Sequence, residues 1–261
     1  MLTNRVIPIL LLDNGRLVKT TKFKRPKYVG DPINAIRIFN DKEVDELVLL
    51  DIRASKKNIE PDYEMIEMVA SECFMPLSYG GGIKNIDQAK KIFSLGVEKV
   101  SIQEPLMDNY NLLKEISHRF GSSSVIASID VKKNFFGKTK IFNSSNNKIK
   151  NKSWENHLRE CIESGAGEIL LNSVDHDGLR KGTNIDAIKK ASKITTVPLI
   201  AAGGIGSLKN IKETIDAGAD AVGAGAFFVY QGPHRAILIT YPKYDALEKL
   251  LNEKSDARKN L

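Results

Sequence analysis

The sequence predicts a single domain, 1–261, folded as a (β/α)8 TIM barrel, and two observations support that prediction. Eight short apolar runs alternate with segments of helical spacing, which is the pattern of parallel strands buried on both faces. Shifting 76–100 by 122 positions also aligns identical residues, among them Pro198, Gly203, Gly204 and Lys212. Two similar four-strand halves can close on each other, whereas an open doubly wound sheet, the alternative fold, has no need of such a repeat.

The elements follow in a regular order along the chain. The predicted strands are 6–12, 46–51, 76–79, 99–102, 125–130, 168–172, 198–202 and 221–224. Helical spacing appears between them, for instance after Pro61, from Leu208 to Ile215 and from Leu247 to Leu251. Two excursions, 13–31 and 131–152, interrupt this spacing after the first and fifth strands. Both leave from the carboxyl ends of strands, where barrel enzymes carry their active sites.

Composition narrows the class of protein. The chain has 39 Lys and Arg against 32 Asp and Glu, a net charge of +7, with 42% hydrophobic residues, as in ordinary globular domains. No apolar run approaches the ~18 residues of a membrane span, so we expect a cytoplasmic protein without membrane contact. Cys73 and Cys161 predict neither a disulfide nor a metal site. Because the positive charge is spread along the chain, we expect phosphorylated small molecules rather than nucleic acid as ligands.

Two glycine clusters are the strongest functional signal. Gly80–Gly82 and Gly203–Gly204 follow the third and seventh strands, each shortly before a predicted helix. Glycine permits close backbone approach, and a helix start favours anions, although glycine also serves simple tight turns. Two clusters related by the repeat predict a phosphate site on each side of the barrel mouth, with 223–226 completing the second site.

Three carboxylates stand at or after strand ends, where a side chain can act as acid or base. Asp130 ends the fifth strand and is the strongest candidate, while Asp51 and Asp175 are equally well explained as turn residues. The first excursion carries Arg16, Lys19, Lys22, Lys24, Arg25 and Lys27, and we interpret it as a basic, mobile lid over an anionic ligand or, alternatively, as a solvated loop.

Four charges of alternating sign mark the opposite end of the barrel. Arg5, Glu46, Lys99 and Glu168 stand at the starts of strands one, two, four and six, and we expect a ring of ion pairs across the floor. Such a ring is structural at the least, and if it opens it admits a small polar molecule. The four His residues lack metal spacing, so we expect no metal and no cofactor.

The ordered motifs resemble a known family across almost the whole chain. They include Gly15–Lys19, Gly30–Pro32, Leu50–Ile52, Gly80–Ile83, Ala127–Asp130, Asp175–Gly178 and Gly203–Gly204. Together they are similar to the cyclase subunit of imidazole glycerol phosphate synthase, HisF. The resemblance implies that a HisH-type glutaminase docks at the barrel floor and releases ammonia, which travels through the barrel to a substrate with two phosphates.

The resemblance also assigns roles to residues. Asp130 would be one of a catalytic acid/base pair, and Lys19 would lie on the loop that closes over the substrate. Arg5, Glu46, Lys99 and Glu168 would form the ammonia gate. The phosphate-binding and substrate-binding residues would be Asp51, Gly81, Gly82, Gln103, Asp175, Gly178, Gly203, Gly204, Gly225 and Ala226, with Gln103 where the family usually has Asn.

The departures from the family pattern bear on the reaction. Leu11 stands where the family has its other catalytic Asp, and leucine cannot transfer a proton. Asp13 shares the face of Leu11 if the strand continues, ~6.6 Å nearer the mouth, so we name it as a substitute acid. Arg53 replaces a small polar residue and adds a cation near the mouth.

A segment at 229–242 is added after the eighth strand, and 253–261 is a polar tail. The added segment resembles the variant of the family that works beside a sugar amidotransferase in surface-polysaccharide pathways, where an acetamido sugar becomes an acetamidino sugar. We expect its apolar centre, 236–239, to form a docking surface or a self-packed strand rather than a plain covering loop.

Three interpretations follow. The chain is a repurposed HisF-type subunit that passes ammonia to a sugar amidotransferase, or an authentic cyclase of histidine biosynthesis, or a non-catalytic scaffold that retained its phosphate sites.

Overall fold

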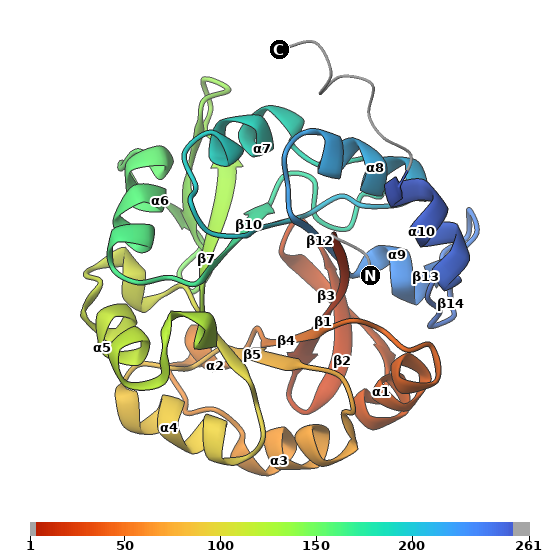
Figure 1. Ribbon diagram of the computed structural model, residues 1–261, viewed down its shortest axis with the longest axis horizontal. Coiled ribbons are helices and arrows are strands. Elements are labelled where there is room, and N and C mark those ends of the chain that lie inside the picture. Colours follow the sequence, from red (N-terminus) through yellow and green to blue (C-terminus); the bar gives the residue numbers. More distant parts are fainter. Residues whose placement is uncertain (1–3, 253–261) are drawn as a thin grey trace.

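The computed structural model describes residues 4–252 and places eight parallel strands in a closed barrel (Figure 1). The polar tail predicted at 253–261 lies outside the described residues. The barrel strands are β1 (Arg5–Asp13), β4 (Leu47–Asp51), β5 (Leu77–Gly80), β6 (Lys99–Ile102), β7 (Val125–Lys133), β10 (Glu168–Ser173), β11 (Leu199–Ala202) and β12 (Ala221–Ala224). They pair in this order, and β12 pairs in parallel with β1. That last pairing closes the sheet, which confirms the barrel and excludes the open-sheet alternative.

Helices cover the outside of the barrel, as the apolar spacing predicted. They are α1 (Pro32–Asp41), α2 (Ala54–Lys57), α3 (Tyr63–Glu72), α4 (Ile86–Ser94), α5 (Asn111–Phe120), α6 (Trp154–Glu163), α7 (Ile185–Ser192), α8 (Leu208–Asp216), α9 (Ala226–Val229) and α10 (Tyr244–Asn252), with 3-10 turns η1 (Pro105–Met107) and η2 (Ser122–Ser124). Asn85 and Ser207 cap α4 and α8 at positions related by the sequence repeat.

The apolar residues divide between two compartments. A large cluster packs between the strands and the helices, and includes Leu10, Leu12, Tyr79 and Phe228. A smaller cluster fills the barrel interior: Ile7, Ile9, Val48, Ile126, Leu170, Ile200, Ala202 and Ala221, with Leu11 and Leu50 packed against it. The barrel is therefore a packed core with an apolar layer across its middle.

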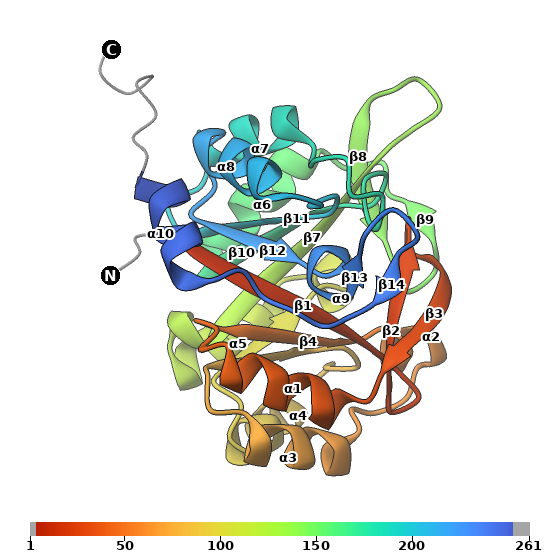
Figure 2. The ribbon, with the colours of Figure 1, turned by 90° about the vertical axis from the view of Figure 1, so that its right-hand side faces the viewer.

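Three hairpins lie at one end of the barrel, and α10 lies at the other (Figure 2). The first excursion forms β2 (Arg16–Thr21) and β3 (Lys24–Gly30), and the second forms β8 (Thr139–Asn143) and β9 (Lys148–Ile149). The added segment contains β13 (Tyr230–Gln231) and β14 (Ala236–Ile237). The first excursion, expected to be a mobile lid or a solvated loop, is a hairpin that continues β1 as an antiparallel sheet in which Leu11 pairs with Val18. Its mobility stays a prediction.

Candidate functional site

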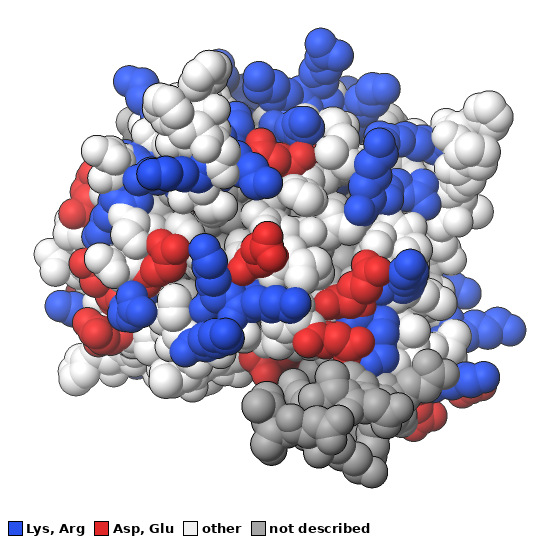
Figure 3. All heavy atoms as spheres, turned by 90° about the horizontal axis from the view of Figure 1, so that it is seen from above, with Lys and Arg blue, Asp and Glu red and all other residues white. Residues whose placement is uncertain are grey.

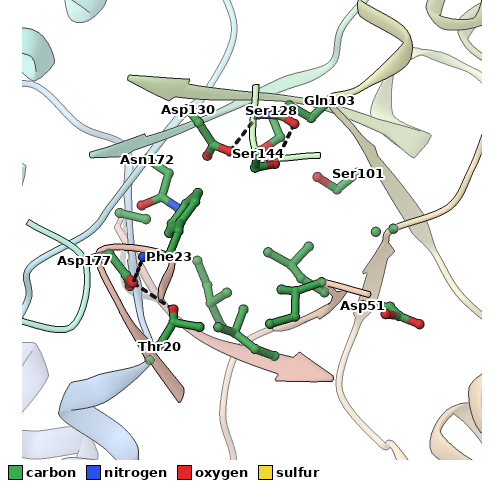
Figure 4. Close-up of a pocket in the computed structure, with 18 of the residues that line it drawn as sticks. Thr20, Phe23, Asp51, Ser101, Gln103, Ser128, Asp130, Ser144, Asn172 and Asp177 are labelled. Carbon is green, nitrogen blue, oxygen red and sulfur yellow. Dashed lines mark hydrogen bonds between the residues drawn. The ribbon is translucent and has the colours of Figure 1, made fainter. Parts of the chain in front are cut away.

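A cavity of about 150 Å³ opens at the carboxyl ends of the strands (Figure 4). Polar side chains from strands β6, β7 and β10 and from the turn after β8 line one wall: Ser101, Gln103, Ser128, Asp130, Ser144 and Asn172. Ile9, Leu11 and Leu50 line the opposite wall. This mouth pocket therefore combines a polar wall with an apolar patch, and Lys19, Thr20, Asp51 and Asp177 line it as well.

Asp130 is the central ionisable group of the polar wall. It is buried at 5% exposure, and Gln103 Nε2 donates to its Oδ2 at 2.6 Å. Gln103 is itself fixed, because the same Nε2 donates to the Phe142 carbonyl at 3.1 Å and Ser144 Oγ donates to Oε1 at 2.8 Å. Burial raises the pKa of Asp130 to about 7. A carboxyl that titrates near neutrality is suited to give or take a proton.

Asp13 does not share this pocket with Asp130. Leu11 lines the mouth pocket, whereas Asp13 lines a smaller neighbouring hollow. The strand does continue to Asp13, but its last residues pair with β2, Asp13 opposite Arg16, and lead the chain into the hairpin. The structure therefore gives no support to Asp13 as the substitute acid expected from strand alternation.

Lys19, expected on the loop that closes over the substrate, lies on β2 and is buried at the mouth. Its Nζ lies 2.7 Å from Asp177 Oδ1, and the side chain is 7% exposed. Asp177 Oδ2 also accepts from Thr20 Oγ1 at 2.9 Å and from the Phe23 amide at 3.3 Å. This carboxylate therefore joins the β2–β3 hairpin to the loop after β10, and Figure 4 shows Phe23 and Thr20 beside it. We call the contacts of Asp177 with Lys19, Thr20 and Phe23 the clasp.

Sequence analysis did not single out Asp177, although it lies in the Asp175–Gly178 motif. Gly178 lies under the clasp, since an added Cβ would stand 2.3 Å from the Thr20 carbonyl oxygen. Asp175 is outside the mouth pocket and accepts from the Lys133 amide at 2.7 Å. Its observed contact is to the second excursion rather than to the pocket.

Asp51 lines the pocket but has a local structural contact as well. Its Oδ1 accepts from the amides of Arg53 and Ala54 at 2.8 and 3.0 Å. Burial raises its pKa, and these two amides oppose the rise. The carboxylate therefore stabilises the turn into α2, as the turn interpretation expected.

The glycines predicted to bind phosphate line the pocket from both halves of the barrel: Gly81, Gly82, Gly203, Gly204, Gly225 and, beside them, Ala226. A Cβ on Gly81 would lie 2.3 Å from the Asp51 carbonyl oxygen, and one on Gly203 would lie 2.5 Å from that of Ser173. These contacts obey the same offset as the sequence repeat. Packing alone thus requires glycine at both positions, and phosphate binding remains a prediction.

The predicted ring of charges is present at the floor and is closed. Arg5 contacts Glu46 at 2.5 Å and Glu168 at 3.1 Å. Lys99 contacts the same two carboxylates at 3.0 and 2.7 Å. Glu46 is 2% exposed, so the two acids are buried with two cations between them. We call these four residues the floor ring.

The mouth end is basic and carries exposed apolar side chains. Segment 14–30 has six Lys and Arg, 131–152 has seven Lys, and neither contains an acid. Figure 3 shows Lys and Arg gathered over the upper part of the view, which is this end. Phe135 and Phe136, in the turn after β7, are 97% and 81% exposed.

The apolar centre of the added segment is largely exposed, with Ile237 at 54% and Leu238 at 59%. β13 and β14 pair with each other but do not bury these two side chains. The segment therefore forms the expected strand pairing through its backbone, but these two side chains are not buried against the barrel. A docking surface stays a prediction.

Other chemistry is limited within the part of the chain that the structure describes. No cluster of three or more His, Cys, Asp or Glu is arranged to hold a metal. Both cysteines are free, and burial raises the pKa of Cys73 to about 11 and that of Cys161 to about 12. No helix in 4–252 is long and apolar enough to cross a membrane.

Comparisons with known proteins agree with this geometry. The family model described as "Histidine biosynthesis protein" matches residues 5–234. A Pseudomonas aeruginosa protein, provisionally named imidazole glycerol phosphate synthase subunit hisF2, is 50% identical over 95% of this chain and 99% of its own. A similarly named Leptospira interrogans protein is 47% identical over 96% and 99%. The imidazole glycerol phosphate synthase subunit HisF of Exiguobacterium sibiricum is 35% identical over 87% and 91%.

Proposed function

The chain belongs to the histidine biosynthesis protein family, among the HisF-type subunits of imidazole glycerol phosphate synthase, and on that premise we propose that it delivers ammonia. The ammonia comes from a HisH-type glutaminase docked at the barrel floor and passes through the barrel to an acceptor at the mouth. The acceptor reaction we propose is the amidination of an acetamido sugar for surface polysaccharide, carried out with a sugar amidotransferase.

The floor ring is the observation that carries the proposal. Its ion pairs span the barrel axis below an apolar interior layer. A charged ammonium ion would lose its hydration in that layer at a large free-energy cost, whereas neutral ammonia would not. A ring that opens at the floor and an apolar layer above it together favour passage of neutral ammonia over water-borne ions.

Leu11 distinguishes this chain from a self-sufficient cyclase. It lines the mouth pocket from β1, whereas Asp130 lines it from β7, and leucine offers no proton. Of the two catalytic acids that the resemblance implies, the pocket thus retains Asp130 alone; Asp51 and Asp177, which also line it, are held by the turn into α2 and by Lys19. Loss of the second acid with retention of the floor ring is what we expect of a subunit that supplies ammonia to another enzyme's reaction.

The mouth end also supports a third protein partner. Phe135 and Phe136 are exposed on one hairpin, and Ile237 and Leu238 are exposed on another that lies at the same end but on a different side of the barrel (Figures 1 and 2). Exposed apolar side chains commonly mark protein contacts.

An authentic cyclase is the second candidate. Asp130 has a pKa of about 7, and the glycine loops predicted to bind both phosphates are in place. A HisF-deficient bacterium tests it: growth without histidine, restored by this chain, would favour the cyclase and contradict the sugar assignment.

Co-purification tests the proposal itself. The barrel, a HisH-type glutaminase and a sugar amidotransferase should form one complex, with glutaminase activity rising on assembly. If no such complex forms, ammonia delivery to a sugar amidotransferase is contradicted. A glutaminase unaffected by ligand at the barrel mouth would instead indicate the scaffold.

A further inference from the structure

A second hollow of about 130 Å³ lies beside the mouth pocket, between the β2–β3 hairpin and α2. Phe23, Pro26 and Ile52 supply its apolar surface, and Arg53, Lys56 and Lys57 supply three positive charges. Phe23, Ile52 and Lys56 also line the mouth pocket. The two hollows are therefore neighbours with shared walls.

The three cations form no direct ion pair in the part of the chain that the structure describes, although the charge of Lys56 acts on Asp130 in the neighbouring pocket. Within residues 4–252, none of them forms an ion pair within 4.0 Å, and Asp13, the carboxylate that lines the same hollow, forms none either. Arg53 Nη1 donates to Asn14 Oδ1 at 2.5 Å. Its Nε is buried without an acceptor, and a buried donor without an acceptor costs free energy. Because Nε has almost no accessible surface, an anion in the hollow would contact the outer guanidinium nitrogens, and the Nε–Hε signal would report that contact through the shared guanidinium.

We propose that this hollow is an anion subsite in which Arg53, Lys56 and Lys57 bind a phosphate or carboxylate group of the ligand held in the mouth pocket. A guanidinium matches the paired oxygens of either group, and lysines add positive charge without geometric demand. Lys56 borders both hollows, so one ligand can extend from the glycine loops into this subsite. The inference goes beyond the proposed function, because it holds whichever enzyme consumes the ammonia.

The test is a titration of the purified chain with inorganic phosphate, followed by the NMR signal of the Arg53 Nε–Hε group. Arg53→Lys assigns that signal by removing it. We expect a saturable shift with half-saturation at about 1–10 mM, as for a small anion at an open site. Sodium acetate in a parallel titration reports whether a carboxylate suffices, and sodium chloride over the same range controls for ionic strength.

Two variants make the result specific. Lys57→Gln, an exposed change on α2, should raise the half-saturation concentration for Arg53 at least threefold. Arg235→Gln, which removes an exposed cation in the turn between β13 and β14, should leave it unchanged. Because phosphate bound at the glycine loops is read from the amides of Gly81 and Gly203, the two kinds of site remain distinguishable.

The proposal is overturned if the Arg53 signal follows chloride as closely as phosphate and acetate, or if Lys57→Gln has no effect. The titration needs neither glutaminase nor acceptor, so its failure is separate from failure of the proposed function.

Discussion

Asp177 holds the β2–β3 hairpin against the mouth, so replacing it by Asn should loosen that hairpin. The carboxylate accepts three hydrogen bonds, one of them from the buried ammonium of Lys19 at 2.7 Å. A hydrogen bond to a charged group contributes about 1.5–3 kcal/mol. Asn keeps one acceptor oxygen but loses the charge, so the free energy of opening should fall by about 2 kcal/mol, roughly a 30-fold larger open population.

Hydrogen exchange of the Lys22 and Phe23 amides measures this opening directly. Both donate to Asp177, to its backbone carbonyl at 3.0 Å and to Oδ2 at 3.3 Å. In Asp177→Asn we expect the Lys22 amide to exchange roughly 30-fold faster at neutral pH, while amides in β4 keep their rates. Asp175→Asn is the matched control, since Asp175 contacts the second excursion. Unchanged exchange at Lys22 in Asp177→Asn would refute the clasp.

Three further outcomes are expected. Burial raises the pKa of Asp130 to about 7, so ionisation of this carboxyl weakens the folded state as pH rises from the ordinary range of a carboxyl through 7. The Tm of Asp130→Asn relative to wild type should therefore be higher at pH 8.5 than at pH 5. An equal Tm difference at both pH values would show that the buried charge does not destabilise the fold. Lys99→Met leaves Glu46 and Glu168 with Arg5 alone, so the free energy of unfolding, measured in urea, should fall by about 3 kcal/mol. The control Lys209→Met, which breaks an exposed pair, should change it by less than about 0.5 kcal/mol. Equal losses in the two variants would argue against a tightly coupled floor ring. Leu11→Asp restores an acid to the mouth pocket and should produce imidazole glycerol phosphate, detected chromatographically, where wild type produces none; a variant that binds substrate but stays inactive would show that more than one acid was lost.

The barrel strands could be predicted because each is a short apolar run with a glycine or polar boundary. The 122-residue repeat reappears in three dimensions, since Gly81 and Gly203 pack against equivalent carbonyls. The β2–β3 hairpin could not be predicted in this way. Residues Lys24–Tyr28 of β3 are exposed, so burial imposes no alternating pattern on them.

Long-range contacts explain why the site differs from the one predicted from the sequence. The role of Asp177 follows from its contact with Lys19, 158 positions away, and no local pattern in the sequence indicates that contact. Asp13 was predicted to share the face of Leu11 by strand periodicity, but the pairing with β2 carries it into another hollow. The floor ring was predictable because each of its members stands at the start of a barrel strand, where topology brings them together.

The most direct test of the central claim is a cyclase assay on the purified barrel with saturating ammonium and the bisphosphate substrate of the family, phosphoribulosyl-formimino aminoimidazole carboxamide ribonucleotide. Free ammonium bypasses the glutaminase. We predict that the substrate binds but is not converted to imidazole glycerol phosphate, because Leu11 cannot replace an acid. Turnover of about one per second or faster would contradict this account and assign the chain to histidine biosynthesis.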